Sequence, residues 1–377
     1  MVVLGMATRV AAQPQRALLD RRANAGGRSR VGARTVCNAQ RVEEKDRMES
    51  SVRWAGETDV LSKIVNAAIS NAVLYEGIMK PMARRTLIKT AEKNGVQWRD
   101  DASKLEATEE VYSLYNKLRD PTVKYPDYYL QPFHAYTEGN LCWQAAFEAE
   151  SATYSMALRV WPDEGMKWEG AQDRLRASYV GCITAHIKDH NLPSPKRIVD
   201  AGCSVGISTR AVHAAFPEAE MTGLDLSPNM LAVATYRDAD EASCPQKMPG
   251  DHASLRQRRR WVHGKAEATG FEDDSMDLFS LSFVIHECPQ QATRDIIAEA
   301  ARVLKPGGVF VMTDNNPQSS VIQNLPPALA TLMKSTEPHS DEYYTLDVEQ
   351  ALRDAGFTDV HSEASDPRHR TVLGTRS

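Results

Sequence analysis

The sequence predicts an α/β fold for the C-terminal part of the chain: a doubly wound, mostly parallel seven-stranded sheet, preceded by a helical N-terminal extension. Three observations predict it. From residue 196 onward, short apolar runs alternate with amphipathic helical patterns. A glycine-containing turn joins the first run to the first helix, and the last two runs have no helix between them. Alternating strands and helices favour a parallel sheet that helices cover on both faces.

Each expected strand is a short apolar run, and each expected helix shows apolar residues at helical spacing. The strands are expected at 197–201, 220–225, 261–264, 277–283, 309–313, 359–362 and 371–375. The helices between them are expected at 207–216, 229–236, 290–304 and 346–356. The two final strands predict an antiparallel hairpin at the sheet edge. The stretch 238–260, rich in arginine at its end, predicts a solvated surface loop.

The region before the sheet divides into segments of different composition. Residues 41–60 are polar and predict a linker; 61–190 predict a helical, aromatic-rich extension; and 191–377 predict the sheet domain. Helices are expected from residue 61 and at 81–94, 143–160 and 173–190. Basic residues within 61–94 indicate either a peripheral membrane contact or a helix packed on the main domain. No run of about 18 apolar residues exists, so no transmembrane segment is expected.

The first forty residues differ from the rest. They contain seven Arg, no Lys and a single acid, Asp20. An arginine-rich, acid-poor segment is typical of an organelle transit peptide. We therefore expect residues 1–40 to be a transit peptide, with a plastid-type processing site at 34–39 and a chloroplast destination. A mitochondrial address and a merely disordered basic tail are the alternatives.

Charge and cysteine usage exclude some classes of function. The net charge of −5 argues against nucleic acid as a partner. The six cysteines form no C-x-x-C pair. Cys182, His186 and His190 share one face of an expected helix, but without a ligand motif around them a packed face is the better interpretation, and no metal site is expected.

The strongest chemical signal is the segment 199–206, VDAGCSVG, which joins the first strand to the first helix. In an open α/β sheet, ligands bind at this edge, and glycine lets them approach the backbone. A second signal is Asp225, at the end of the second strand, where a carboxylate can accept both hydroxyls of a ribose. A dinucleotide-binding G-x-G-x-x-G would need glycine where Ser204 and Ile207 stand, which disfavours an NAD-dependent oxidoreductase.

This arrangement resembles the class I S-adenosylmethionine-dependent methyltransferases of the methyltransferase-11 type, which are related to quinone-biosynthesis C-methyltransferases. The resemblance covers about 195–375 and rests on 199–206, 223–229, 264–277 and 301–310. It implies S-adenosyl-L-methionine as cofactor, held by the glycine bend, by the acid at 225 and beside 265–267. The expected cofactor-binding residues are Asp200, Gly202, Ser204, Gly206, Asp225, Leu226, Ala266, Glu267 and Phe283.

Two residues depart from the family pattern. Ser204 stands in place of the usual middle glycine, and Lys265 in place of the usual acid beside the adenine, which leaves Glu267 for that role. The stretches 132–140, 334–338 and 366–370 also resemble a plastid and cyanobacterial branch of these enzymes. That resemblance supports plastid targeting and implies no reaction beyond methyl transfer.

Acceptor-side residues are expected after the fourth and fifth strands. His286 and Glu287 are the candidate catalytic pair, able to orient or deprotonate an acceptor, or else a polar pair that closes a turn. His134 and Asp314–Asn316 are weaker candidates for the acceptor side. The aromatic residues Tyr128, Tyr129, Phe133 and Tyr136 form either a lid or a hydrophobic cluster.

The segment 319–337 is apolar at Leu325, Leu329, Leu332 and Met333, as an acceptor-binding insertion would be. The sequence therefore favours methyl transfer to a small, apolar acceptor such as a prenyl quinone in the plastid. A non-catalytic protein that binds the cofactor as an assembly or regulatory factor is the alternative, and an oxidoreductase is the weaker one.

Overall fold

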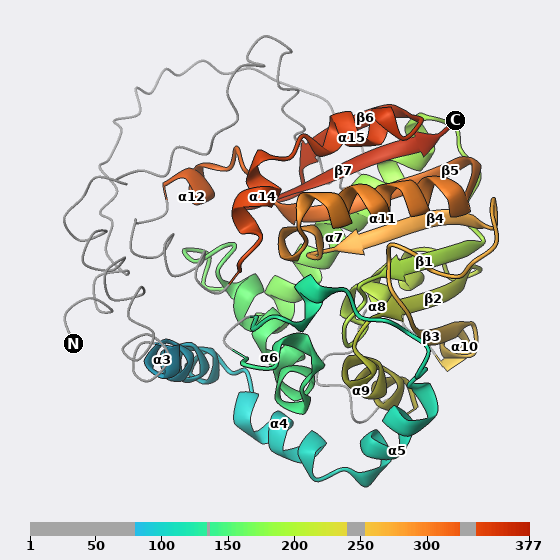
Figure 1. Ribbon diagram of the computed structural model, residues 1–377. Coiled ribbons are helices and arrows are strands. Elements are labelled where there is room, and N and C mark those ends of the chain that lie inside the picture. Colours follow the sequence, from blue (N-terminus) through green and yellow to red (C-terminus); the bar gives the residue numbers. More distant parts are fainter. Residues whose placement is uncertain (1–79, 134–135, 240–252, 325–336) are drawn as a thin grey trace, which may run out of the picture. The chain divides into compact units, whose positions relative to one another are not determined.

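A computed structural model describes residues 80–133, 136–239, 253–324 and 337–377. The expected transit peptide, linker and first helix, together with His134 and the apolar residues 325–333, lie outside the described residues. Within them, seven strands form one sheet in the order β3-β2-β1-β4-β5-β7-β6 (Figure 1). The strands are β1 (Arg197–Ala201), β2 (Glu220–Asp225), β3 (Arg259–His263), β4 (Met276–Ser282), β5 (Leu304–Asn315), β6 (Phe357–Ala364) and β7 (His369–Arg376).

Strand pairing confirms the predicted fold class. β1 pairs in parallel with β2 and β4, β2 with β3, and β4 with β5. β7 runs antiparallel between β5 and β6, which is the expected hairpin at the sheet edge. The order reverses between β1 and β4, so the carboxyl ends of β1, β2 and β4 meet where a ligand crevice is expected.

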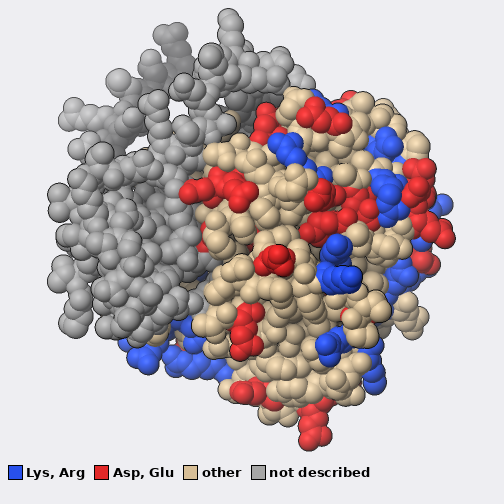
Figure 2. All heavy atoms as spheres, viewed as in Figure 1, with Lys and Arg blue, Asp and Glu red and all other residues tan. Residues whose placement is uncertain are grey.

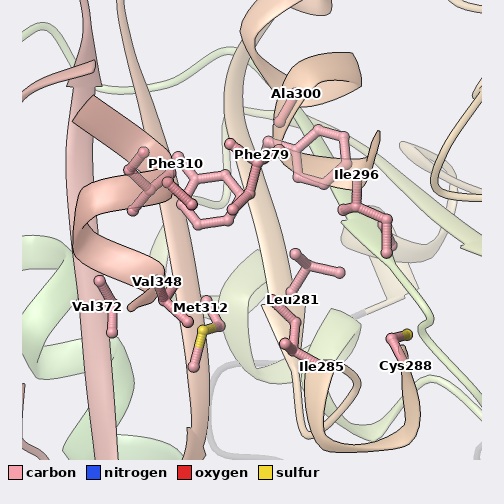
Figure 3. Packing of buried hydrophobic residues seen from close by; sticks show 14 of the residues in the cluster. Phe279, Leu281, Ile285, Cys288, Ile296, Ala300, Phe310, Met312, Val348 and Val372 are labelled. Carbon is pink, nitrogen blue, oxygen red and sulfur yellow. The ribbon is translucent and has the colours of Figure 1, made fainter. Parts of the chain in front are cut away.

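Helices cover both faces of the sheet (Figure 1). One face carries α11 (Gln290–Val303), α14 (Ser340–Thr345) and α15 (Val348–Asp354). The other carries α7 (Trp168–Asp189) and α8 (Ile207–Ala215). Figure 3 shows core residues packed together: Phe279 and Leu281 of β4 lie on the side of Ile296 and Ala300 of α11, and Met312 of β5 lies beside Val348 of α15. Strands buried on both faces read as continuous apolar runs, which explains why their positions were predictable.

The N-terminal extension contains more helices than expected. It comprises α3 (Lys80–Lys93), α4 (Trp98–Glu106), α5 (Glu109–Leu118) and α6 (Trp143–Leu158), with short 3-10 turns η2 (Asp127–Leu130) and η3 (Gly139–Leu141). α4 and α5 were not predicted. Buried residues of these helices pack with Val205 and Ile207 at the start of α8 and with Met230 and Val233 of α9 (Pro228–Ala239). The extension therefore packs directly against the elements that carry the glycine bend.

Buried ion pairs join the extension to the sheet domain. Glu150 of α6 is 4% exposed, and its Oε2 lies 2.7 Å from Arg237 of α9. Its Oε1 lies 3.5 Å from Arg210 of α8. Removing one partner of such a pair would leave a buried charge uncompensated, so these contacts tie α6 to α8 and α9.

The predicted surface loop 238–260 is wrong at both ends. α9 continues to Ala239, α10 (Ala253–Arg256) follows, and β3 begins at Arg259. The side chain of Arg259 is fully buried, with Nη1 2.7 Å from Oδ1 of Asp238. The run of arginines suggested solvent exposure, but its partner lies on the preceding helix, where sequence patterning does not reveal it. β5 begins at Leu304, the last residue of the helix expected at 290–304, with a register shift against β4.

No helix among the described residues is both long enough and apolar enough to cross a membrane. The short helices α12 (Ser320–Gln323) and η5 (Ile285–Glu287) complete the fold. Both follow strands at the carboxyl edge of the sheet, and η5 carries the predicted catalytic pair.

Candidate cofactor and acceptor site

The bend after β1 is built by left-handed backbone and by hydrogen bonds to β2. Gly202, Ser204 and Gly206 have φ angles of 68°, 51° and 82°. The N–H groups of Gly202 and Cys203 both donate to the carbonyl of Leu224, at 2.8 and 3.1 Å. Of residues 200–206, Gly202 and Ser204 are partly exposed and the others are buried. The bend therefore presents these two residues to any ligand at this edge.

Asp225 lies against this bend. Its Oδ2 accepts the N–H of Ser204 at 2.7 Å, and its Oδ1 accepts the N–H of Ser227 at 2.7 Å. Burial raises the pKa of Asp225 to about 6, although both bonds oppose the shift. The carboxylate is thus ionised at neutral pH, and each oxygen keeps a further lone pair for a ligand.

Asp200 has a different environment from the one expected of a ligand-binding residue. It is fully buried, and its Oδ2 accepts the hydroxyls of Ser208 and Thr209, both at 2.7 Å. Burial raises the pKa of Asp200, and the two hydroxyl bonds oppose that shift. Its visible role is to fasten β1 to the first turn of α8, which fixes the bend between them.

The glycines at 202, 206 and 223 make room for side chains. A Cβ at Gly206 would lie 2.2 Å from the ring of Trp261, and one at Gly223 would lie 2.4 Å from it. A Cβ at Gly202 would lie 2.5 Å from Val284, which follows β4. These glycines therefore permit close packing of β3 and of the post-β4 segment on the bend. Trp261 in turn donates from Nε1 to Asp238, at 3.1 Å.

A segment of the extension crosses the carboxyl ends of β2 and β3. The N–H of Asp120 donates to Nδ1 of His263 at 2.9 Å, so the ring proton must lie on Nε2. Nε2 is 3.1 Å from the carbonyl of Leu226 and 3.1 Å from the hydroxyl of Tyr125. Burial lowers the pKa of His263 and keeps the ring neutral. A neutral histidine thus holds the extension beside the buried Leu226.

Glu267, which follows β3, is in contact with Tyr128 of the extension. The hydroxyl of Tyr128 donates to Oε1 of Glu267 at 2.6 Å. Oε2 of Glu267 is buried and forms no hydrogen bond to any described residue. Ala266 is half-buried and packs against the hydrophobic core on the α11 face. An acceptor atom without a donor is therefore available where the adenine is expected.

The expected aromatic lid divides into two parts. Tyr129 lies close enough to Asp225 and Glu287 that burial and these carboxylates raise the pKa of its hydroxyl well above the ordinary value. Tyr128 and Tyr129 thus lie over the expected site. Tyr136 instead donates to Glu148 of α6, at 2.8 Å, and Phe133 is buried in a backbone bridge with Tyr136. Tyr136 and Phe133 therefore pack within the N-terminal extension and do not face the carboxyl edge of the sheet.

The predicted catalytic pair lies at the carboxyl ends of β4 and β5. Nδ1 of His286 is 2.8 Å from Oδ1 of Asp314, and the N–H of His286 donates to Oδ2 of Asp314 at 3.1 Å. Burial alone would lower the pKa of His286, but Asp314 outweighs it and raises the pKa to about 10. His286 is therefore an imidazolium at neutral pH. Glu287 is half-buried and accepts a bond from the side-chain amide of Asn140, at 3.0 Å.

Phe283 directly follows β4 in the left-handed region, with φ 61°. Its N–H donates to the carbonyl of Thr313 at 2.8 Å, and its ring lies 5.0 Å from that of His369. The guanidinium of Arg176, on α7, lies 5.7 Å from the Phe283 ring. A non-glycine residue in this backbone region is strained, and such strain is concentrated at functional sites.

Sequence reasoning missed several residues at this edge. Asp366 and His369 form a buried pair beside Phe283, and Asn140 contacts Glu287. Asp366 and His369 are only three positions apart, which was the available signal. Their place beside the site depends on the pairing of β7 with β5. The sequence predicted the final hairpin but did not predict which strand of the sheet it joins.

Two other features do not form part of this site. A shallow depression of about 220 Å³, lined by Arg197, Glu220 and neighbouring residues, lies at the amino ends of β1, β2 and β3, on the opposite edge. Cys182 and His186 are buried against the sheet, where Nε2 of His186 is 3.0 Å from the Thr375 hydroxyl. The described part of the chain holds no group of three His, Cys, Asp or Glu side chains that could bind a metal.

Comparisons with known proteins agree with this geometry. Residues 199–312 match the family described as "Methyltransferase domain". An uncharacterized methyltransferase of Synechocystis is 31% identical over 179 residues, which are 45% of this chain and 74% of that protein. A ubiquinone/menaquinone biosynthesis C-methyltransferase of Methylobacterium nodulans is 36% identical over 118 residues, 31% of this chain and 41% of that protein.

A third relative is a mitochondrial 2-methoxy-6-polyprenyl-1,4-benzoquinol methylase of Caenorhabditis elegans. It is 27% identical over 168 residues, 39% of this chain and 53% of that protein. The chain thus spans about half the length of the two quinone methyltransferases. The matched residues include the bend, Asp225 and the strands up to β5, and they show that the chain belongs to the class I S-adenosylmethionine-dependent methyltransferases.

Proposed function

We propose that this protein transfers a methyl group from S-adenosyl-L-methionine to a small, quinone-like acceptor. The observation that carries the proposal is the contact between the bend and the acid: Oδ2 of Asp225 lies 2.7 Å from the amide nitrogen of Ser204. A nucleoside bound at this edge would meet a carboxylate and an open backbone bend at once.

The residues present fit the cofactor. The remaining lone pairs of Asp225 suit the two ribose hydroxyls, and the buried, unbonded Oε2 of Glu267 suits the adenine amino group. Leu226 and Ala266 supply apolar surface between these two acids, and Gly202 and Ser204 expose the bend for the amino-acid part. Bound there, the cofactor supplies an activated methyl group on a sulfonium.

The chain's own part in methyl transfer is to position the reactants and exclude water. Tyr128, which bonds to Glu267, and Tyr129, which lies near Asp225, cover the nucleoside end. His286 is kept cationic by Asp314. Its ring N–H can donate a hydrogen bond to an acceptor oxygen, and its positive charge favours negative charge on that oxygen. It orients the acceptor and does not serve as its base.

Two observations support a quinone-like acceptor. Two relatives are named for quinone or quinol methylation. The apolar pattern at 325–333 favours the same class, although it lies outside the described residues. A plastid location, with the mitochondrion as alternative, rests on the composition of residues 1–40 and stays a prediction.

A quinone with a prenyl tail resides in a membrane, and α3 offers a surface that suits one. Its exposed residues include Arg85, Lys89 and Lys93, one helical turn apart, with Met82 45% exposed beside them. Figure 2 shows basic side chains gathered over this helix. We propose that this row rests on an anionic lipid surface while the acceptor is bound.

The direct test is to incubate the full chain with methyl-labelled cofactor and a series of reduced naphthoquinones and benzoquinones. Label in one quinone product would support the proposal. Tight binding of S-adenosylhomocysteine without any labelled product would favour the non-catalytic alternative. Binding of NAD in preference to S-adenosylhomocysteine would overturn the proposal. The antiparallel β7 already departs from the order 3-2-1-4-5-6 of dinucleotide folds.

A further inference from the structure

A second aspartate–histidine pair lies at the same edge of the sheet and takes no part in the function proposed above. His369 begins β7, and antiparallel pairing places it opposite Asn315, at the carboxyl end of β5. The side chains of His369 and Asp366 are 2% and 1% exposed. Such a buried polar pair calls for an explanation, either in packing or in chemistry.

Asp366 determines which ring nitrogen of His369 carries the proton. Its Oδ2 is 2.8 Å from Nδ1 of His369, and its Oδ1 accepts the N–H groups of Arg368 and His369 at 2.8 and 2.9 Å. Burial alone would raise the pKa of Asp366, but these bonds outweigh it and lower the pKa. Because the carboxylate stays anionic, it accepts Nδ1–H, so Nε2 is the ring nitrogen that can take up a proton.

The turn that carries the pair is fixed to the segment after β5. The N–H of Asn316 donates to the carbonyl of Arg368 at 2.9 Å, and the hydroxyl of Ser319 donates to the carbonyl of Pro367 at 2.6 Å. The ring of His369 is therefore held in place from two directions, by its own carboxylate and by the chain that leaves β5. Rigid support of this kind is what a catalytic side chain requires.

The ring faces the end of β4. Its centroid lies 5.0 Å from that of Phe283, three residues before His286. Strand alternation places His369 on the α7 face, where Leu373 of β7 also packs, whereas Arg370 turns toward Tyr343 on the other face. The two histidines thus approach the end of β4 from opposite faces of the sheet.

The charged groups around His369 come from its own turn and from α7. Asp366 and Arg368 belong to that turn, and Arg176 of α7 lies over the intervening Phe283. Asp314 lies opposite Arg370 in the pairing of β5 with β7, on the other face of the sheet. Of these, only Asp366 bonds to the ring among the described residues. An imidazole oriented by a carboxylate, with its second nitrogen unprotonated, is the arrangement of a general base.

We propose that His369, oriented by Asp366, is the general base that removes the acceptor's proton, while His286 remains a fixed cation. This inference rests on the proposed function. An electron pair of the acceptor forms the bond to the methyl carbon as the bond from that carbon to sulfur breaks and leaves its electrons on sulfur. The acceptor's proton passes to Nε2 of His369, and Asp366 stabilises the imidazolium that results.

The first test needs no acceptor and so separates this inference from the proposed function. The full-length protein is labelled with ¹⁵N in histidine, and the His369 signals are assigned by their loss in His369→Asn. At pH 8, with S-adenosylhomocysteine added, we expect a proton on Nδ1 and an unprotonated Nε2. A proton on Nε2, or on both nitrogens, would overturn the proposal.

The second test measures turnover with reduced 1,4-naphthoquinone as the probe. His369→Asn keeps a donor close to the place of Nδ1, so the bond to Asp366 survives while the base is lost. We expect turnover to fall by about 10²- to 10⁴-fold with unchanged affinity for S-adenosylhomocysteine and an unchanged Tm. Added imidazole should partly restore His369→Ala, which a purely structural role would not allow.

The matched control is His361→Asn on β6, away from this edge, which should turn over like the unmodified protein. Unmodified turnover in His369→Asn would overturn the proposal. If the unmodified protein binds S-adenosylhomocysteine but leaves the naphthoquinol unmethylated, the acceptor class proposed above is wrong. In that case the NMR measurement by itself tests the role of His369, because it needs no acceptor.

Discussion

Asp225 has a structural role and, in the proposed function, a ligand-binding role for the same carboxylate. Its bond from the N–H of Ser204 holds the bend against β2, its bond from the N–H of Ser227 fixes the turn after β2, and the remaining lone pairs are left for the expected ribose. We expect Asp225→Ala to weaken binding of S-adenosylhomocysteine by about 1–3 kcal/mol through loss of charge-assisted hydrogen bonds. Titration calorimetry measures the difference.

A suitable control is Asp354→Ala, because Asp354 lies on α15 and, among the described residues, bonds only to Gln350 of its own helix. Its affinity should equal that of the unmodified protein. Equal affinities in all three proteins would show that the ribose does not bind at Asp225.

His286 illustrates how a partner changes the chemistry of a residue that the sequence had singled out. A histidine after the fourth strand suggests a base, but the contact with Asp314 keeps it protonated. Asp314 is 28 positions away, and only the pairing of β4 with β5 brings the two together. The location of the residue was therefore predictable, whereas its charge was not.

His286→Ala should lower turnover by at least about tenfold and leave affinity for S-adenosylhomocysteine unchanged, since the proposed role of the side chain is to orient the acceptor. Its effect on stability should depend on pH. The pKa of about 10 exceeds the unfolded value of 6.5, so the stabilisation is complete below about pH 6.5 and is lost as pH rises through about 10.

The Tm difference between the unmodified protein and His286→Ala should therefore shrink between pH 8 and 11. Differential scanning calorimetry at several pH values measures it. A difference that stays constant across this range would contradict the ion pair with Asp314.

At the scale of elements, the packing of β3 on β2 requires a glycine in β2 that is not expected to contact a ligand. Gly223 of β2 lies beneath Trp261, and an added Cβ would meet the ring at 2.4 Å. Gly223→Ala should lower the free energy of unfolding by about 1–3 kcal/mol through overpacking. Urea denaturation of the purified protein gives the value.

Gly181 of α7 supplies the contrast, because a Cβ there would meet nothing within 4 Å. Gly181→Ala should stabilise the protein by about 0.5–1 kcal/mol, as expected in a helix interior. Similar effects of the two substitutions would mean that Trp261 does not pack over Gly223.

The elements also show what local patterning reveals. The parallel strands were predictable because burial on both faces leaves continuous apolar runs. The short helices α4 and α5 were missed because each buries only one or two residues, too few for a periodic signal. The bond from Tyr128 to Glu267 joins residues 139 positions apart and has no local signal at all.

At the scale of the whole molecule, the extension and the sheet domain share one packed structure. α7, predicted within the extension, covers the sheet, and Glu150 of α6 binds arginines of α8 and α9. The same extension carries Tyr128, which bonds to Glu267, and the basic row on α3. The residues proposed to cover the cofactor and those proposed to contact a membrane thus belong to the same N-terminal extension.

The basic row makes a prediction about lipid binding. Replacing Arg85, Lys89 and Lys93 with Gln should weaken binding to phosphatidylserine vesicles by about 100-fold, at about 1 kcal/mol for each charge. Vesicle flotation measures it, and added salt should weaken binding by the unmodified protein.

The control replaces three exposed cations elsewhere, Lys117, Lys188 and Arg294, with Gln. It matches the change in charge and leaves α3 intact. Equal loss of binding in both variants would indicate a general charge effect without a defined surface on α3.

The most direct measurement is a crystal structure of the full chain with S-adenosylhomocysteine. We expect both ribose hydroxyls within hydrogen-bond distance of Asp225, the adenine amino group beside Oε2 of Glu267, and the amino-acid part along Gly202 and Ser204. A ligand bound elsewhere, or side chains that keep the space between the bend and Asp225 filled, would contradict this expectation.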